Sequence, residues 1–304
     1  MMPSAPAVAA FPRPLGLVLS GGGAIGGAQV GHLLALRDLG IVQDVIVGTS
    51  VGAINGAVVA ADPDLGAERL AAIWSRVRRE DIFPLRPLRL LASLAAQPAG
   101  LLPASGLVRF VTAHLAECDL DNLRVPLHVI ATDAQTGELV DLTTGPLLDA
   151  LVASSAIPGV FPPVRLGERT LLDGGLVADI PVERAFDLGV RSAIILDASG
   201  PCEITRPPRT VIESMAWALR VLTRSQADAH VHASSLRGLV IHLPTPCTAR
   251  HSVLDFRGVD DLIRTTRRLT LDFFAARADE PWPALGMVGR QHRHTADHVC
   301  LATA

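Results

Sequence analysis

Short apolar runs alternate with longer segments of helical period along most of the chain. An apolar run at residues 15–19 precedes a helical pattern that reaches about Leu39, and a second run at 44–47 precedes a helical pattern from Ser50. This alternation is typical of parallel strands joined by helical crossovers and buried on both faces. We therefore expect one α/β domain without internal repeats. Further strands are expected at 127–132, 139–142, 192–196 and 239–242, and further helices near 146–155, 181–188, 211–232 and 260–276.

Three segments depart from this rhythm. Residues 81–106 interleave leucines with prolines and two arginines, so this segment is either a cap or lid over the site or an ordinary packed excursion. The mixture of leucine and arginine from 82 to 102 also motivates an expectation of peripheral membrane contact. Residues 1–14 are expected to form a flexible tail and the His-rich residues 281–304 a loosely ordered one, which leaves 15–280 as the main domain.

Composition excludes several kinds of chemistry. The chain has 304 residues, 49% of them apolar, which is enough for a buried core. Its formal net charge of -3 gives no basic excess, so nucleic acid is not an expected partner. All 27 basic residues are arginine and tyrosine is absent, which excludes a lysine base, a Schiff base and a tyrosine acid.

The cysteines and the apolar runs bear on location. Four cysteines lie far apart and form no Cys-x-x-Cys pair, which argues against a zinc site or a disulfide framework and favours a reduced, cytoplasmic setting. The amino terminus has no positive charge before a very short apolar stretch, so it is a poor secretory signal. The longest apolar run, residues 45–61, is shorter than the roughly 20 residues of a membrane-spanning helix. A buried strand and helix explain it better.

A serine in a glycine-framed turn is the first candidate for chemistry. The residues that close an apolar strand and open a helix of small residues are Gly48, Thr49, Ser50, Val51 and Gly52. A serine on such a sharp turn adopts strained dihedrals, so the residues two positions to either side must lack side chains. The turn would present the hydroxyl at the carboxyl end of the sheet, above a helix amino terminus that favours developing negative charge. A plain tight turn is the alternative.

A glycine-rich stretch follows the first strand and opens a long amphipathic helix. Its residues are Gly21, Gly22, Gly23, Ala24, Ile25 and Gly26. Consecutive glycines let backbone amides converge on an anion, either a pyrophosphate or the oxyanion of acyl transfer. A dinucleotide fold needs an acidic residue at the end of the second strand, where Gly48, Thr49 and Ser50 stand. A phosphate-binding nucleotide loop needs a lysine, which the chain lacks, so the oxyanion interpretation is favoured.

An aspartate before two glycines is the third feature. Asp173 precedes Gly174 and Gly175 after an apolar lead-in, a pattern that alone indicates no more than a turn. Upstream, residues 154–164 read Ser-Ser-Ala-Ile-Pro-Gly-Val-Phe-Pro-Pro-Val. In this order over roughly residues 15–196, the glycine-rich loop, the elbow, this segment and the Asp-Gly-Gly motif resemble the patatin-like phospholipases. As a set, at these separations, the pattern is highly specific.

The resemblance implies a three-layer α/β/α fold related to the α/β hydrolases, with a central, mostly parallel sheet and with residues 15–280 as the catalytic domain. It implies that Ser50 attacks an ester carbonyl and that Asp173 serves directly as its base. The oxyanion would bind four consecutive backbone amides, those of Gly21, Gly22, Gly23 and Ala24. The remaining motif glycines are Gly26, Gly48, Gly52, Gly174 and Gly175. A lipid or other fatty-acyl ester would be hydrolysed through an acyl-enzyme intermediate, without a metal or an organic cofactor.

Alternatives stay open on several points. A histidine triad would need one of the histidines that follow Asp173, which include His230, His232, His242 and His251. The tail histidines at 292, 294 and 298 lack a matching acidic or cysteine motif, so no metal site is expected there. The same fold would also serve acyl transfer to an alcohol or lysolipid, or a catalytically silent scaffold. Many family members carry arginine or lysine where this chain has Ile25, and headgroup preference and full activity depend on that position.

Overall fold

The structure is a computed structural model of the chain. It describes residues 11–83, 100, 102–115, 119–198, 208–247, 253–289, 291–294 and 300–303. The strands are β1 (Leu15–Leu19), β2 (Val45–Thr49), β3 (Leu127–Asp133), β4 (Leu139–Leu142), β5 (Val164–Leu166), β6 (Arg169–Asp173), β7 (Ser192–Leu196), β8 (Leu239–His242), β9 (Gly286–Gly289), β10 (Gln291–His294) and β11 (Cys300–Thr303). The helices are α1 (Gly27–Asp38), α2 (Val51–Ala61), α3 (Gly66–Trp74), α4 (Arg79–Ile82), α6 (Ser105–His114), α7 (Leu147–Ser154), α8 (Gly175–Ala178), α9 (Val182–Asp187), α10 (Val211–Ser235) and α11 (Val259–Ala275), with 3-10 turns at Gly23–Gly26 and Leu120–Asn122.

The main sheet is mostly parallel. Its strands lie in the order β5-β6-β3-β2-β1-β7-β8-β9, and β4 also pairs with β3. The strands from β3 through β9 in this order are parallel to one another, whereas β4 and β6 run antiparallel to β3 and β5 antiparallel to β6. The carboxyl ends of the parallel strands meet at one edge of the sheet, which is where a site is expected in such a fold.

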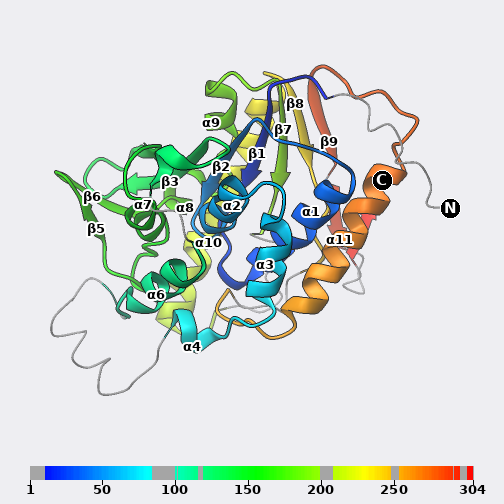
Figure 1. The fold of residues 1–304 in the computed structure, drawn as a ribbon. Coiled ribbons are helices and arrows are strands. Elements are labelled where there is room, and N and C mark those ends of the chain that lie inside the picture. Colours follow the sequence, from blue (N-terminus) through cyan, green and yellow to red (C-terminus); the bar gives the residue numbers. More distant parts are fainter. Residues whose placement is uncertain are drawn as a thin grey trace.

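Helices cover both faces of this sheet (Figure 1). Because side chains alternate along a strand, Leu17 and Leu19 of β1 join one buried cluster and Val18 joins the other. The larger cluster also contains side chains of α1, α2, α3 and α11, including Leu33, Ala57, Leu70 and Ile263. The smaller cluster contains side chains of α8, α9 and α10, including Ala178, Phe186 and Val231. The result is the three-layer α/β/α architecture that the sequence predicts.

The strands predicted from apolar runs are confirmed, and the differences lie at the edges of the sheet. The hairpin of β5 and β6 and the edge strand β9 were not predicted, and β9 falls inside the segment expected to form a loose tail. Phe11, in the segment expected to form the other tail, is buried against Phe274 and Trp282. The expected cap or lid is described only at its two ends, because residues 84–99 and 101 lie outside the described part. At those ends Ile82, Phe83 and Leu102 are buried in the larger cluster.

Within the described residues, no helix combines the length and the hydropathy that crossing a membrane requires.

Candidate active site

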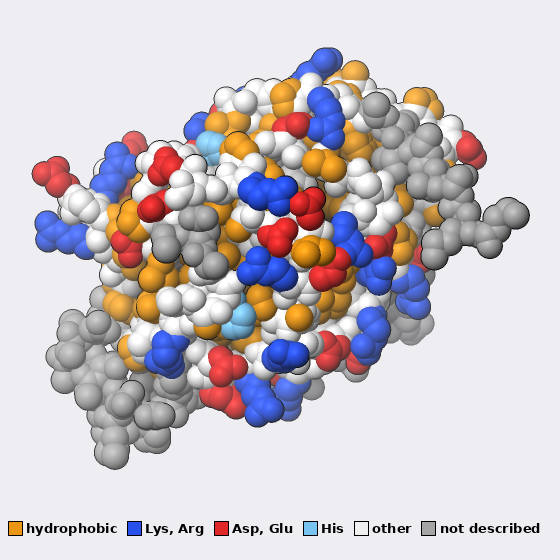
Figure 2. Space-filling model, viewed as in Figure 1, with side chains coloured by type: hydrophobic (Ala, Val, Ile, Leu, Met, Phe, Trp, Pro, Cys, Tyr) orange, Lys and Arg blue, Asp and Glu red, His pale blue; other side chains and the backbone are white. Residues whose placement is uncertain are grey.

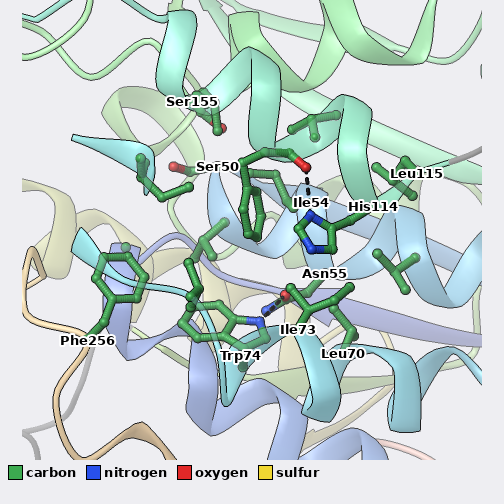
Figure 3. Close-up of a pocket in the computed structure, with 18 of the residues that line it drawn as sticks. Ser50, Ile54, Asn55, Leu70, Ile73, Trp74, His114, Leu115, Ser155 and Phe256 are labelled. Atoms are coloured by element: carbon green, nitrogen blue, oxygen red, sulfur yellow. Dashed lines mark hydrogen bonds between the residues drawn. The ribbon is translucent and has the colours of Figure 1, made fainter. Parts of the chain in front are cut away.

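Ser50 stands at a strained turn between β2 and α2. Its dihedrals are φ 55° and ψ -124°, and it is the one non-glycine residue of the described part with a positive φ. A serine held in this sparsely populated region stores roughly 1–3 kcal/mol of strain, which the surrounding fold must offset. Ser50 lines a cavity, and Figure 3 shows its hydroxyl at one end of that cavity.

The two glycines that frame this turn are required by close packing. A Cβ atom at Gly48 would lie 2.8 Å from backbone atoms of Ala53. A Cβ at Gly52 would lie 2.5 Å from the carbonyl oxygen of Ser20, in the strand-end segment next to the turn. Both approaches are to backbone, which cannot rotate out of the way. The Gly-x-Ser-x-Gly spacing therefore follows from the contact between α2 and the ends of β1 and β2.

The register of the sheet brings Asp173 close to this turn. In β3, Ile130 is paired with Thr49 of β2, and the next residue, Ala131, is paired with Asp173 of β6. The end of β6 and the end of β2 are thus level on either side of β3, about 10 Å apart at the backbone given the usual strand spacing. Two side chains that lean toward each other across one strand can close that distance.

Ser50 and Asp173 do meet. The Ser50 hydroxyl lies next to the Asp173 carboxylate, close enough to lower the pKa of that carboxyl, and one carboxylate oxygen accepts the amide of Gly175 at 2.8 Å. Both side chains are buried, with Ser50 6% and Asp173 7% exposed. Burial raises the pKa of Asp173 from 3.8 to about 6, although the Gly175 amide and the Ser50 hydroxyl act in the opposite direction. The carboxylate is therefore a stronger base than an ordinary aspartate, yet it is ionised at neutral pH.

A second serine, Ser154, holds the Ser50 turn in place by hydrogen bonds. The Ser154 hydroxyl, at the end of α7, accepts the amide of Ser50 at 2.8 Å and donates to the carbonyl of Ile130 at 2.6 Å. The carbonyl of Ser154 accepts the amide of Gly174 at 3.3 Å. Ser154 thus ties the nucleophile turn, β3 and the Asp-Gly-Gly turn together. The sequence placed Ser154 in a family motif, but nothing local in the chain indicated which backbone groups it would hold.

The glycine-rich loop offers fewer free amides than the sequence indicated. The amide of Gly21 donates to the carbonyl of Asp179 at 3.1 Å, and that of Ala24 donates to the carbonyl of Val253 at 2.8 Å. Within the described part of the chain, the amides of Gly22 and Gly23 have no backbone carbonyl partner. In this conformation segments distant in sequence already occupy the amides of Gly21 and Ala24, so of the four predicted donors those of Gly22 and Gly23 are the ones without a backbone partner among the described residues.

Ile25, at the position where the family resemblance implies a basic residue, does not face the site. Its side chain is 2% exposed and packs with Ala28, Ala198 and Leu262 in a small buried cluster. A cation at this position would have to be removed from water among apolar neighbours. An isoleucine fits this environment, and its direct effect here is on packing of the glycine-rich loop.

A largely apolar cavity of about 750 Å³, mouth included, opens beside Ser50 (Figure 3). Its walls come from α2, α3, α4, α6 and the segment after α7, and they include Ile54, Leu70, Val111 and Phe161. Two stacked aromatic pairs border it, Trp74 with Phe256 and Phe83 with Phe161. The apolar and aromatic character of these walls suits a hydrocarbon group.

Most polar groups in the wall already have partners in the protein. The Asn55 amide donates to the carbonyl of Gly26 and to Gln29, and its oxygen accepts the indole N–H of Trp74 at 3.0 Å. His114 bonds through Nδ1 to the carbonyl of Phe110 in its own helix at 2.8 Å. These groups are occupied, so the cavity presents an apolar surface to a ligand along most of its length.

The histidines considered for a triad lie elsewhere. His242 is buried with its Nε2 3.3 Å from Asp197, and His230 lies 3.8 Å from Glu183. Among the described residues no histidine is bonded to Ser50 or Asp173, and His251 falls outside them. No group of three or more potential metal ligands occurs in the described part either.

Fold and site together define a three-layer α/β protein with a strained serine elbow facing an apolar cavity. The protein-family model described as patatin-like phospholipase matches residues 17–186, which is more than half of the chain. The chain belongs to the patatin-like phospholipase family.

Curated relatives agree with this assignment. A patatin-like phospholipase domain-containing protein of Caenorhabditis elegans is 33% identical over 186 residues, which cover 60% of this chain and 13% of that protein. An uncharacterized NTE family protein of Mycobacterium tuberculosis is 32% identical over 223 residues, which cover 72% of this chain and 58% of that protein. The chain thus spans less than two thirds of the length of these relatives.

Solved structures of low sequence identity are also similar. Human GIVD cytosolic phospholipase A2, in complex with methyl gamma-linolenyl fluorophosphonate, gives a TM-score of 0.48 at 12% identity over 88% of this chain and 58% of that one. VipD from Legionella pneumophila gives a TM-score of 0.41 at 16% identity over 87% of this chain and 67% of that one. Likeness at this level concerns the path of the chain alone.

Proposed function

We propose that this protein is a lipid acyl hydrolase that cleaves carboxylic esters with a Ser50-Asp173 dyad. The observation that supports this proposal is the placement of the Ser50 hydroxyl, on its strained turn, next to the buried Asp173 carboxylate at the end of an apolar cavity. A hydroxyl paired with a base is the arrangement that nucleophilic catalysis needs. The cavity would take the acyl chain, and membership of the family favours a lipid as its source.

In the acylation step, the Ser50 Oγ attacks the ester carbonyl carbon as its proton moves to Asp173. The carbonyl oxygen gains negative charge and is received by the amides of Gly22 and Gly23, for which each lost donor typically costs about 3 kcal/mol of transition-state stabilisation. The bond to the alkoxy oxygen then breaks, and Asp173 returns the proton to the departing alcohol. Water cleaves the acyl-Ser50 ester in the same way, with Asp173 again taking the proton.

The test combines covalent labelling with turnover. Wild type, Ser50→Ala and Asp173→Asn would be treated with a fluorophosphonate probe and assayed against p-nitrophenyl esters and phospholipids. We expect wild type to label at Ser50, and each variant to lose at least about a thousandfold in turnover because members of such a unit act together. Absence of labelling and turnover in folded wild type would reject the proposal. Product analysis with an added alcohol separates hydrolysis from acyl transfer.

We also propose that the first half of α10 is where the protein contacts a membrane surface. Four apolar side chains of this half are exposed: Met215 is 69%, Trp217 43%, Val221 45% and Leu222 63% exposed. At helical spacing they fall within roughly half of the helix circumference, and Glu213 and Ser214 at the start of the helix are exposed as well. Further along α10, Ala227 is 1% exposed and faces the protein. Several large apolar side chains exposed together on one helix indicate a surface that binds a partner.

Position and charge favour lipid as the occupant of this surface. In Figure 1 the first half of α10 extends beyond the carboxyl ends of the strands, at the same end of the molecule as α4 and α6, which line the cavity. Exposed arginines at or next to α4 and on α6 include Arg76, Arg78, Arg79 and Arg109, and they would attract anionic headgroups. Two exposed acidic residues of α4, Glu80 and Asp81, lie among these arginines, and Figure 2 shows side chains of both charges intermixed over this face.

Vesicle sedimentation tests this surface. We expect wild type to bind anionic phospholipid vesicles and Leu222→Asp to lose that binding, since an ionised side chain resists burial among lipids. Val42→Asp is the matched control, because Val42 is 59% exposed just before the amino end of β2. Equal binding by the two variants, or dimer formation that only Leu222→Asp abolishes, would reject the membrane assignment.

A further inference from the structure

One hydroxyl in the wall of the cavity has no hydrogen-bond partner among the described residues. Ser155 lines the cavity together with Ser50 and Gly23, its side chain is 5% exposed, and its Oγ is buried without a hydrogen bond. Figure 3 shows the hydroxyl oxygens of Ser155 and Ser50 at the same end of the cavity, away from His114 and Leu115. A buried hydroxyl without a partner destabilises the folded protein, and native proteins retain few of them. Its placement beside a nucleophile calls for a functional reason.

The neighbours of Ser155 fix where this hydroxyl lies. The preceding residue, Ser154, holds the amide of Ser50 at 2.8 Å. The following residue, Ala156, accepts the amide of Asp173 at 3.0 Å through its carbonyl. Ser155 is therefore held between the residue that clamps the nucleophile turn and the residue that anchors the base. With its neighbours bonded on both sides, Ser155 is kept beside the Ser50-Asp173 pair by backbone contacts, independently of its own hydroxyl.

The two oxygens of an ester place different demands on this site. The carbonyl oxygen has the amides of Gly22 and Gly23, on the side of the glycine-rich loop. The alkoxy oxygen has no donor among the groups assigned so far, although it gains negative charge when its bond to the acyl carbon breaks. Asp173 only returns to this oxygen the proton that it took from Ser50, and it offers no second hydrogen bond. A free O–H at the same end of the cavity would supply the missing donor.

We propose that the Ser155 hydroxyl donates a hydrogen bond to the alkoxy oxygen of the bound ester and so stabilises the leaving group during acylation of Ser50. This inference rests on the proposed hydrolase function. The bond that forms joins the Ser50 Oγ to the acyl carbon, and the bond that breaks joins that carbon to the alkoxy oxygen. The proton of Ser50 reaches the leaving alcohol through Asp173, while Ser155 keeps its own proton throughout. No oxidant, reductant or further reactant is needed.

The test varies the leaving group while the acyl group stays the same. Hexanoate esters of p-nitrophenol, trifluoroethanol and ethanol would be compared for wild type and Ser155→Ala by kcat/KM, which reports on acylation. A p-nitrophenolate departs without help, so we expect a change of less than about threefold for that ester. For the ethyl ester we expect a loss of about tenfold to a hundredfold, the range for a hydrogen bond to a charged oxygen. Ser155→Thr keeps the hydroxyl and should keep most of the ethyl-ester rate.

The matched control is Ser234→Ala. Ser234 is fully buried and its hydroxyl also has no partner, but it lies on α10 and does not line the cavity. This variant should lose activity on none of the esters. Fluorophosphonate labelling of Ser155→Ala at the wild-type rate would show that the Ser50 turn is intact, because fluoride also leaves without assistance.

Four outcomes would overturn the inference. An equal loss on all three esters would assign Ser155 to packing. A burst of p-nitrophenol followed by slow turnover in Ser155→Ala would assign it to removal of the acyl group by water. Wild type that neither labels nor turns over would reject the hydrolase function itself and this inference with it, whereas an active wild type with an unchanged leaving-group dependence in Ser155→Ala would reject the inference alone.

Discussion

Replacing Asp173 by asparagine should remove activity and, above pH 6, stabilise the fold. Asparagine has the same shape but no charge, so it removes the proposed proton acceptor for Ser50. It also removes a buried ionisable group, because Asp173 is 7% exposed and burial raises its pKa from 3.8 to about 6. A carboxyl whose pKa is higher in the folded state than in the unfolded state binds protons more tightly when the protein is folded.

The size and the pH window follow from that shift. Below pH 4 the carboxyl is protonated in both states, and its contribution to stability is fully present. Between about pH 4 and pH 6 the unfolded chain releases its proton while the folded protein keeps it, so stability falls as pH rises. A shift of about two pH units corresponds to about 3 kcal/mol, all of which is lost above pH 6. Asparagine has no such loss.

The measurement is the free energy of unfolding in urea for wild type and Asp173→Asn at pH 4, 5, 6 and 8. Other titrating groups are common to both proteins, so the difference between them isolates Asp173. We expect that difference to shift by about 3 kcal/mol in favour of Asp173→Asn from pH 4 to pH 8. The asparagine Oδ1 can still accept the Gly175 amide, and the preference of that amide for the ionised carboxylate is already contained in the pKa of about 6. A difference that does not vary with pH would refute the account of the Asp173 environment.

Three further outcomes follow from the site. The kcat/KM of wild type should rise with pH through an apparent pKa of about 6 and then level off, because Asp173 acts as a base only when ionised; a flat profile from pH 5 to 8 would contradict this. Ile54→Trp, in the cavity wall, should shorten the longest acyl chain that is hydrolysed and leave acetate esters unaffected, as a chain-length series would show. Gly52→Ala should destabilise the fold by at least about 3 kcal/mol, measured by thermal unfolding, because the new Cβ would overlap the carbonyl of Ser20. Gly137→Ala is the control: the position has open space but a φ of 73°, so the substitution should cost about 1 kcal/mol.

The central strands could be predicted because each is buried on both faces and therefore reads as an unbroken apolar run. Leu15–Leu19 and Ser192–Leu196 are buried at every position. The hairpin of β5 and β6 escaped detection because its strands are short, lie at the sheet edge and carry the exposed residues Arg165 and Arg169. The edge strand β9 contains two glycines and follows a proline-rich stretch, which favoured its assignment to a tail.

The turn at Ser50 could be predicted from the sequence because the spacing of Gly48 and Gly52 reflects local crowding. The groups that surround this turn could not be predicted, because their roles depend on partners far along the chain. Val253 occupies the amide of Ala24 across more than 200 residues, and nothing near Ala24 indicates this. Ser154 and Ser155 are adjacent in sequence and identical in type, yet one hydroxyl has two partners and the other has none. Only the tertiary structure separates them.

The same burial explains why one carboxylate would suffice where many hydrolases use a histidine as well. Asp173 ends a short antiparallel strand beside β3, so its side chain enters a space already closed by the sheet, the nucleophile turn and the residues after α7. That space excludes water, which strengthens the base and also keeps the cavity apolar enough for an acyl chain. An ester that fills the cavity would remove further water from Asp173. The proposed role of Asp173 as a base and the proposed selectivity for lipid esters would thus have one physical origin, and a substitution that admits water to the cavity should weaken both together.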